Sequence, residues 1–184
     1  MTPAATLPYA VRRREAAAIG VWLFLATVAM LFAAFVSAYL VRRTGADWVP
    51  ITLPVGLWWN TAVVVASSVT LECAWPLRAG SRRRGWLLAT LALGVLFLCG
   101  QAAAWQTLRA AGFLLPSNPH ASFIYVLTGV HAVHLLAALV LMGTVVTRSW
   151  RRAWDAPALT NAARSFWHAL TVIWAVLLVV LTTF

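Results

Sequence analysis

Acidic residues and cysteines are scarce in this sequence of 184 residues, and lysine is absent. Only four side chains are Asp or Glu, and all 14 basic residues are arginine. The chain shows no carboxylate pair, no nucleophile–base pair and no phosphate-binding loop, so it has no visible catalytic residues of its own. Cys73 and Cys99 lie in apolar runs and form neither a CxxC nor a CxxCH motif, so we expect two buried thiols rather than metal or haem ligands.

Apolar residues dominate the rest of the composition. They make up 62% of the chain, charged residues make up 10%, and the mean hydropathy is +0.85, values typical of an integral membrane protein. Each apolar run has about 20 residues or more, enough at ~1.5 Å per residue to cross a hydrocarbon core of roughly 30 Å. We predict an all-α bundle of five transmembrane helices in one domain, residues 1–184, with a cytoplasmic tail over 1–15. The predicted spans are about 16–41, 56–77, 86–108, 121–147 and 165–184.

The distribution of arginines predicts the orientation. One side of the membrane receives eleven: Arg12, Arg13, Arg14, Arg78, Arg82, Arg83, Arg84, Arg148, Arg151, Arg152 and Arg164. The other side receives three: Arg42, Arg43 and Arg109. The positive-inside rule therefore places the N-terminus in the cytoplasm and the C-terminus outside. The net charge of +10 then reflects topology and contact with anionic phospholipid headgroups, with Arg82, Arg83 and Arg84 as candidate contacts, and we expect no nucleic-acid partner.

Two histidines lie inside the fourth apolar run, in the segment YVLTGVHAVHL. On a helix, His131 and His134 lie about 60° apart, and Thr128 on the preceding turn extends the same side. Polar groups at membrane depth usually face protein, so we expect these residues to form hydrogen bonds between helices or contacts with lipid. The fifth run carries further candidates of this kind: Trp167, His168 and Trp174. Trp167 and Trp174, with Thr171, recur at helical spacing and are typical of a packing stripe.

A second interpretation of the histidines is open. His131, His134 and His168 could serve a small membrane cytochrome as ligands of a b-type haem, or could bind a metal. We favour the structural interpretation, without a cofactor in this chain, because no run offers the further ligands that a metal site needs.

Glu72 is the only carboxylate inside an apolar run. It lies about one turn before Pro76 and Arg78, which indicates the cytoplasmic interface. One carboxylate cannot form a proton relay, so we expect Glu72 to pair with a loop arginine rather than to serve transport.

Polar and aromatic residues also recur at fixed places in all five runs, which contain WLFLATVAMLFAAFVSAYLVRR, NTAVVVASSVT, LGVLFLCGQ, TGVHAVH and WHALTVIW in chain order. The pattern consists of Trp22, Phe24, Met30, Phe32, Ala38, Tyr39, Arg42, Asn60, Thr61, Ala66, Ser67, Ser68, Thr70, Leu93, Gly94, Phe97, Gln101, Thr128, Gly129, His131, His134, Trp167, His168 and Trp174. Over residues 15–184 this order and spacing resemble subunit III of the haem-copper cytochrome c and quinol oxidases, in its short five-helix form.

The resemblance implies an accessory, non-redox subunit of an aerobic respiratory oxidase in the bacterial plasma membrane. It implies that the chain stabilises catalytic subunit I and binds phospholipid, while haem and copper lie in partner subunits. The family usually has acidic residues where Val28, Ala104 and Thr171 stand here, so we expect no proton-collecting role. Both electron donors, cytochrome c and quinol, are compatible with the pattern. An accessory subunit of a nitric oxide reductase or of another respiratory complex is the remaining alternative.

Overall fold

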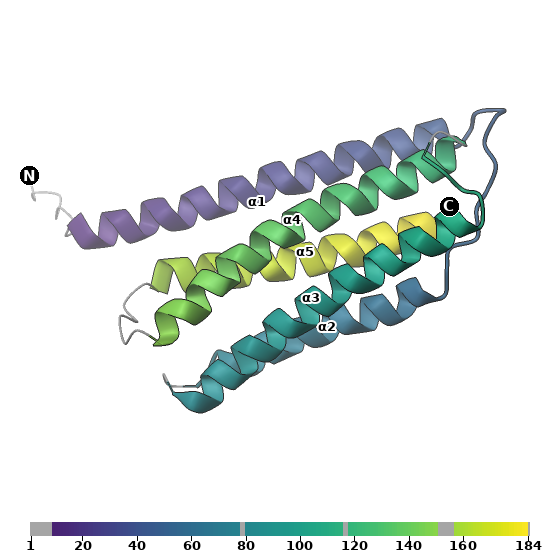
Figure 1. Ribbon diagram of the computed structural model, residues 1–184. Helices are drawn as coiled ribbons and strands as arrows, with labels where there is room; N and C mark the ends of the chain where they lie inside the picture. The colour runs from purple at the N-terminus through teal and green to yellow at the C-terminus, as the bar shows by residue number, and fades with distance from the viewer. Residues whose placement is uncertain (1–8, 78–79, 116–117, 151–156, 184) are drawn as a thin grey trace, which may run out of the picture.

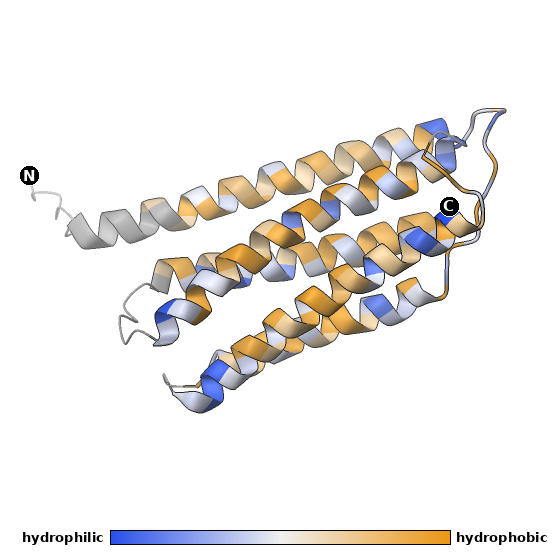
Figure 2. Ribbon diagram, in the orientation of Figure 1, coloured by the Kyte–Doolittle hydropathy of each residue, from blue (hydrophilic) through white to orange (hydrophobic). Residues whose placement is uncertain are grey.

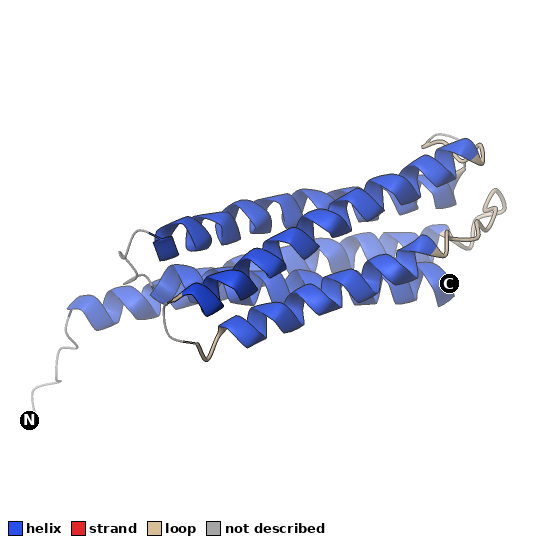
Figure 3. Cartoon of the chain, turned by 60° about the horizontal axis from the view of Figure 1, so that its bottom comes forward, coloured by secondary structure: helices blue, strands red, loops and turns tan. Residues whose placement is uncertain are grey.

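A computed structural model describes residues 9–77, 80–115, 118–150 and 157–183. Within these ranges the chain forms five helices and no strand, which confirms the predicted all-α fold (Figures 1 and 3). The helices are α1 (Tyr9–Arg42), α2 (Gly56–Ala74), α3 (Ser81–Ala110), α4 (Pro119–Trp150) and α5 (Pro157–Thr183). Arg78, Arg151 and Arg152 lie outside the described residues, as do residues 1–8 of the predicted tail and the side chains of Arg12, Arg13 and Arg14.

Local sequence explains where two of the helices begin and end. Asn118 precedes α4, and its Oδ1 accepts the backbone N–H of Ala121 at 2.8 Å, while Pro119 occupies the first helical position. At the end of α3, Gly112 adopts a φ of 85°, a left-handed conformation that glycine enters without strain. The N–H groups of Gly112 and Phe113 then bond to the carbonyls of Arg109 and Leu108, both at 3.0 Å, which closes the helix in a Schellman motif.

The five helices run side by side along one long axis (Figure 1). α2 and α3 pack against each other as an extensive hairpin, α4 packs against both α3 and α5, and α5 also contacts α2. α1 lies at the edge of the bundle, where it contacts α4 and α5 but neither α2 nor α3 within the described residues.

Four of the helices are long and apolar enough to cross a membrane: α1 from Ala18 onward, α3, α4, and α5 from Ala158 onward (Figure 2). The chain is therefore a multi-pass membrane protein. α2 does not reach this standard within the described residues, because polar side chains interrupt its short apolar sequence. These are Asn60, Thr61, Ser67, Ser68, Thr70 and Glu72. A fifth crossing by α2 thus remains a prediction.

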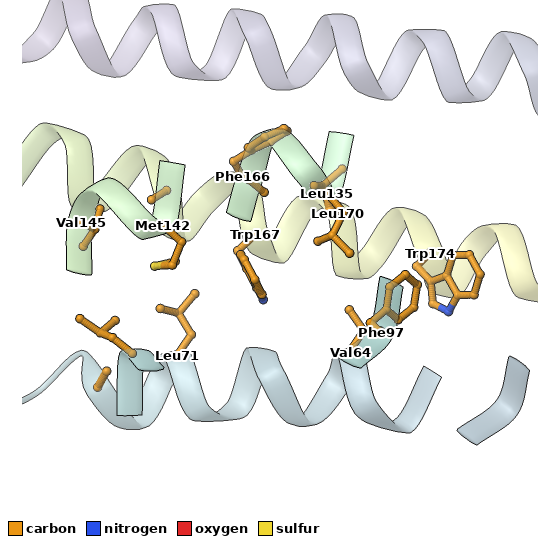
Figure 4. Close-up of a cluster of buried hydrophobic side chains, with 14 of the residues drawn as sticks. Val64, Leu71, Phe97, Leu135, Met142, Val145, Phe166, Trp167, Leu170 and Trp174 are labelled. Carbon is orange, nitrogen blue, oxygen red and sulfur yellow. The ribbon is translucent and has the colours of Figure 1, made fainter. Parts of the chain in front are cut away.

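The core lies where α2, α3, α4 and α5 meet (Figure 4). Trp167 and Trp174 of α5 are almost completely buried there, beside Phe97 of α3. Gly94 of α3 allows the close approach, since a Cβ at this position would lie 2.7 Å from the Trp167 ring. A small residue at a crowded crossing is the usual means of close helix packing in membranes. Cys73 is exposed on the helix surface, as is Cys99, so the expectation of buried thiols was wrong.

A separate aromatic group fixes the loop between α1 and α2. Trp48 stacks on the His120 ring with centroids 4.8 Å apart, and the backbone N–H of Ile51 donates to His120 Nδ1 at 2.9 Å. Asp47 forms an ion pair with Arg42 at the end of α1, and this pair lowers the pKa of the Asp47 carboxyl below its usual value. The contacts with His120 hold the loop against the start of α4, and the ion pair joins it to the end of α1.

Candidate functional site

A row of polar side chains joins α2 to α5. We call this the α2–α5 seam, made of residues from α2 (Thr61, Ser67, Ser68, Glu72) and α5 (Arg164, Trp167, His168, Thr171, Trp174). Because the α5 members recur every three or four residues, they lie on one face of that helix.

The middle of the α2–α5 seam consists of hydroxyl groups and indole nitrogens. Trp174 Nε1 donates to Thr61 Oγ1 at 2.9 Å, and Trp167 Nε1 donates to Ser67 Oγ at 3.0 Å. Thr171 lies between the two tryptophans on α5, and its hydroxyl lies 2.8 Å from that of Ser68. The tryptophans predicted as a packing stripe are therefore both packed and hydrogen-bonded. Buried indole N–H groups usually have such a partner.

One end of the α2–α5 seam carries an ion cluster. Arg164 Nε and Nη2 donate to the two carboxylate oxygens of Glu72 at 2.6 and 2.5 Å, and His168 Nε2 lies 2.6 Å from Glu72 Oε1. The Arg164 guanidinium also lies over the Trp75 ring, 4.2 Å from its centroid. Glu72 thus has an arginine partner, as expected, but Arg164 lies on α5 because this helix begins at Pro157, earlier than predicted.

The α2–α3 hairpin has its own polar links. Asn60 Nδ2 donates to the backbone carbonyl of Phe97 at 3.1 Å, and the hydroxyls of Thr70 and Thr90 lie 2.9 Å apart. Gly100 leaves room for the amide, since a Cβ there would lie 2.4 Å from Asn60 Oδ1. Polar residues that make α2 less apolar are therefore bound to neighbouring helices rather than turned toward lipid.

The three candidate residues on α4, Thr128, His131 and His134, make different contacts. Thr128 links two helices, because its Oγ1 accepts Trp105 Nε1 of α3 at 3.0 Å. His134 Nδ1 lies 2.8 Å from the carbonyl of Val130, one turn earlier on the same helix.

His131 is fully buried, and neither ring nitrogen has a hydrogen-bond partner among the described residues. The hydrogen bond that we expected between helices is therefore not formed there. Aromatic rings surround the imidazole instead, with centroids at 6.2 Å (Phe32), 5.8 Å (Phe97) and 5.1 Å (Trp174).

Replacing His131 with phenylalanine is expected to change the free energy of unfolding by less than about 1 kcal/mol. A buried polar group without a partner contributes no net hydrogen-bond energy, and an apolar ring of similar shape can replace it at little cost. Detergent unfolding of the purified chain, followed by tryptophan fluorescence, measures the change. A loss above about 2 kcal/mol would show that the imidazole has a polar partner, such as bound water.

Arg82, Arg83 and Arg84 lie in the first turn of α3, at the end of the bundle where α2 ends. Arg82 is exposed and the other two are half-buried, and Arg84 Nε donates to the carbonyl of Gly80 at 3.4 Å. The structure does not bring these residues into the α2–α5 seam.

The three positions at which the family usually has an acid are occupied by packed, neutral side chains. Val28 and Ala104 are buried in the two apolar clusters, and Thr171 bonds to Ser68 and to the backbone of Trp167. Across the described residues, no group of three or more His, Cys, Asp or Glu side chains could hold a metal ion. The polar contacts of the α2–α5 seam and of the α2–α3 hairpin join helices to one another.

Fold and site together define a multi-pass helical membrane protein whose inner polar groups bind its helices to one another. The chain belongs to the cytochrome c oxidase subunit III family, whose model matches residues 9–184. It is therefore a non-catalytic subunit of a haem-copper oxidase and associates with other oxidase subunits.

Curated relatives agree with this assignment. A cytochrome c oxidase subunit 3 of Thermostichus vulcanus is 31% identical over 173 residues, which cover 89% of this chain and 85% of the relative. A probable cytochrome c oxidase subunit 3 of Mycobacterium tuberculosis is 26% identical over 186 residues, which cover 94% and 90%. The subunit 3 of a Synechocystis strain is 29% identical over 174 residues, which cover 87% and 72%.

Proposed function

We propose that this chain stabilises the catalytic subunit I of its oxidase and holds phospholipid at the edge of the complex, without binding haem or metal itself. The observation that carries the proposal is the α2–α5 seam, where the only carboxylate of α2 is already engaged by Arg164 and His168. Polar groups used in this way fix the helices relative to one another. The outer surface remains apolar, with exposed side chains such as Trp22, Met30 and Val140, and is suited to lipid and to other membrane helices.

The histidines also fit this role better than that of a small cytochrome. His168 Nε2 is bound to Glu72, and His131 is enclosed by three aromatic rings. A haem ligand needs an open nitrogen facing a cofactor-sized cavity. Haem and copper would accordingly lie in the partner subunits, in a bacterial plasma membrane.

Removal of this subunit from the oxidase tests the proposal. The depleted complex is expected to keep its haem content and nearly its initial rate across pH, because Val28, Ala104 and Thr171 have no proton to exchange near neutral pH. It is expected to lose activity sooner during sustained turnover and to retain fewer tightly bound lipids. The initial rate against pH and the inactivation half-life, with and without the subunit, provide the measurement. A selective fall in initial rate at high pH with unchanged inactivation would indicate a proton-collecting role and contradict the proposal.

The topology of the chain yields a separate prediction. The eleven-to-three arginine distribution and five crossings, α2 included, would place the N-terminus in the cytoplasm and the C-terminus on the opposite face. Alkaline phosphatase and green fluorescent protein fusions at each end are expected to give opposite activities. Termini on the same side would show that one helix does not cross the membrane. α2 would be the first candidate, because it does not reach the standard of length and apolarity that the other four helices meet.

A further inference from the structure

His120 fastens the loop between α1 and α2, residues 43–55, to the start of α4, which lies beside the end of α1 (Figure 1). Its Nδ1 accepts the backbone N–H of Ile51 at 2.9 Å, its ring stacks on Trp48, and its side chain is 3% exposed. An imidazole nitrogen that accepts a hydrogen bond carries no proton. The ring is therefore neutral in this arrangement, with its proton on Nε2.

The surroundings of this ring favour the neutral form over the charged form. Protonation would place an N–H on Nδ1, directly opposite the N–H of Ile51. Nε2 has no hydrogen-bond partner among the described residues, and the rings of Tyr39 and Trp48 lie against the imidazole, with centroids at 5.9 and 4.8 Å. The Val49 carbonyl and the Trp48 face, both near the ring, offset part of the cost of burying a charge. Protonation therefore favours a state in which the ring meets water.

The other ionisable groups near His120 keep their charge around neutral pH. Tyr39 and its neighbour Arg43 are at the end of α1, and a tyrosine hydroxyl and a guanidinium both keep their protons up to about pH 8. Asp47 in the loop is paired with Arg42, and its pKa lies below the usual value, so it stays ionised. Of these groups, only His120 changes its charge between about pH 7.5 and 5.5.

We propose that His120 is a pH-sensitive latch, which holds the loop of residues 43–55 on α4 while it is neutral and releases the loop when it is protonated. The attachment is complete above the titration range of histidine and is lost as the pH falls through that range. Tyr39 joins the end of the edge helix α1 to the same aromatic group, so release also loosens this end of α1. Under the topology predicted above, the latch responds to the pH outside the cell. The inference goes beyond the proposed function and does not depend on it.

Hydrogen exchange of the Ile51 amide in the whole purified oxidase tests the latch. Its protection factor, corrected for the pH dependence of chemical exchange, is expected to fall about tenfold between about pH 7.5 and 5.5, because the imidazole of the open loop titrates near pH ~6.5. The amide of Leu135, in the middle of α4, is expected to keep its protection, which shows that the bundle stays folded. An Ile51 protection factor that is independent of pH would overturn the proposal, as would a parallel loss at Leu135.

His120→Asn is the matched variant. Asparagine Oδ1 takes nearly the place of Nδ1 and can accept the Ile51 N–H, but the amide does not titrate. The Ile51 protection factor of this variant is expected to vary by less than about twofold over the same pH range. His120→Phe keeps a ring beside Trp48 without the acceptor, and we expect weak protection of Ile51 at every pH. If His120→Asn lost protection with falling pH as the native chain does, another group would be responsible and the proposal would be wrong.

Discussion

Trp167→Ala is expected to lower the free energy of unfolding by about 2 to 3 kcal/mol. The side chain is 1% exposed, fills the space above Gly94, and donates to Ser67. Its removal leaves a cavity and takes one donor from the Ser67 hydroxyl, which still donates to the carbonyl of Val64. Truncating a buried tryptophan in a soluble protein costs about 3 to 5 kcal/mol. The lower range applies here because the helix stays in lipid or detergent when the protein unfolds. The indole ring is then not exposed to water in the unfolded state, so its burial contributes little hydrophobic free energy.

Trp59→Ala is the matched control for this change. Trp59 is the same residue type on α2, but its side chain is 75% exposed and faces outward. Its truncation is expected to change the free energy of unfolding by less than about 0.5 kcal/mol. Sodium dodecyl sulfate titration of both variants, followed by circular dichroism, gives the comparison. Similar losses for the two variants would mean that the packing beside Gly94 does not hold the bundle together.

Arg164→Ala is expected to cost about 1 to 2 kcal/mol of unfolding free energy. Among the described residues, the change leaves the Glu72 carboxylate at the end of the α2–α5 seam with His168 as its remaining partner. Breaking a fully buried ion pair costs about 3 to 5 kcal/mol. The smaller value applies because the side chains of Arg164 and Glu72 are 34% and 43% exposed, so water screens the charge that remains.

Glu72→Gln/Arg164→Gln provides the control, since it removes both charges and keeps two side chains that can hydrogen-bond. We expect this double variant to lose less than about 1 kcal/mol, which is less than the single variant loses. The same detergent titration measures both. If the double variant were the less stable of the two, the ion pair itself would contribute net stability, contrary to the assignment of the loss to an unpaired Glu72.

The number of helices followed from the apolar runs, since five runs were predicted to be helical and the described residues form five helices. The polar partners did not follow in the same way. His131 and Thr128 lie on one side of α4, and both were expected to bond across helices. Only Thr128 lies opposite a donor, Trp105, whereas His131 lies opposite aromatic rings. Helical spacing shows which side of a helix faces protein. The polar or aromatic groups that lie opposite that side belong to the neighbouring helix, and helical spacing does not identify them.

The α2–α5 seam illustrates the same limit. Its hydroxyl residues on α2 and its tryptophans on α5 were each visible in the sequence, but their pairing joins residues about one hundred positions apart. Arg164 was assigned to a loop because the apolar run of α5 begins after it, although the helix already begins at Pro157. Hydropathy identifies the lipid-crossing part of a helix and underestimates its length wherever polar residues continue it.

The modest hydropathy of α2 has a consequence for biosynthesis. The translocon sorts each segment by its own apolarity as it leaves the ribosome, and Glu72 and Asn60 count against α2 at that moment. Its ionic partner Arg164 is translated 92 residues later, whereas Thr90 of α3 follows Thr70 by only 20. We therefore expect α2 to enter the lipid phase together with α3, as a two-helix insertion unit. Its carboxylate can pair with Arg164 only after α3 and α4 have been synthesised.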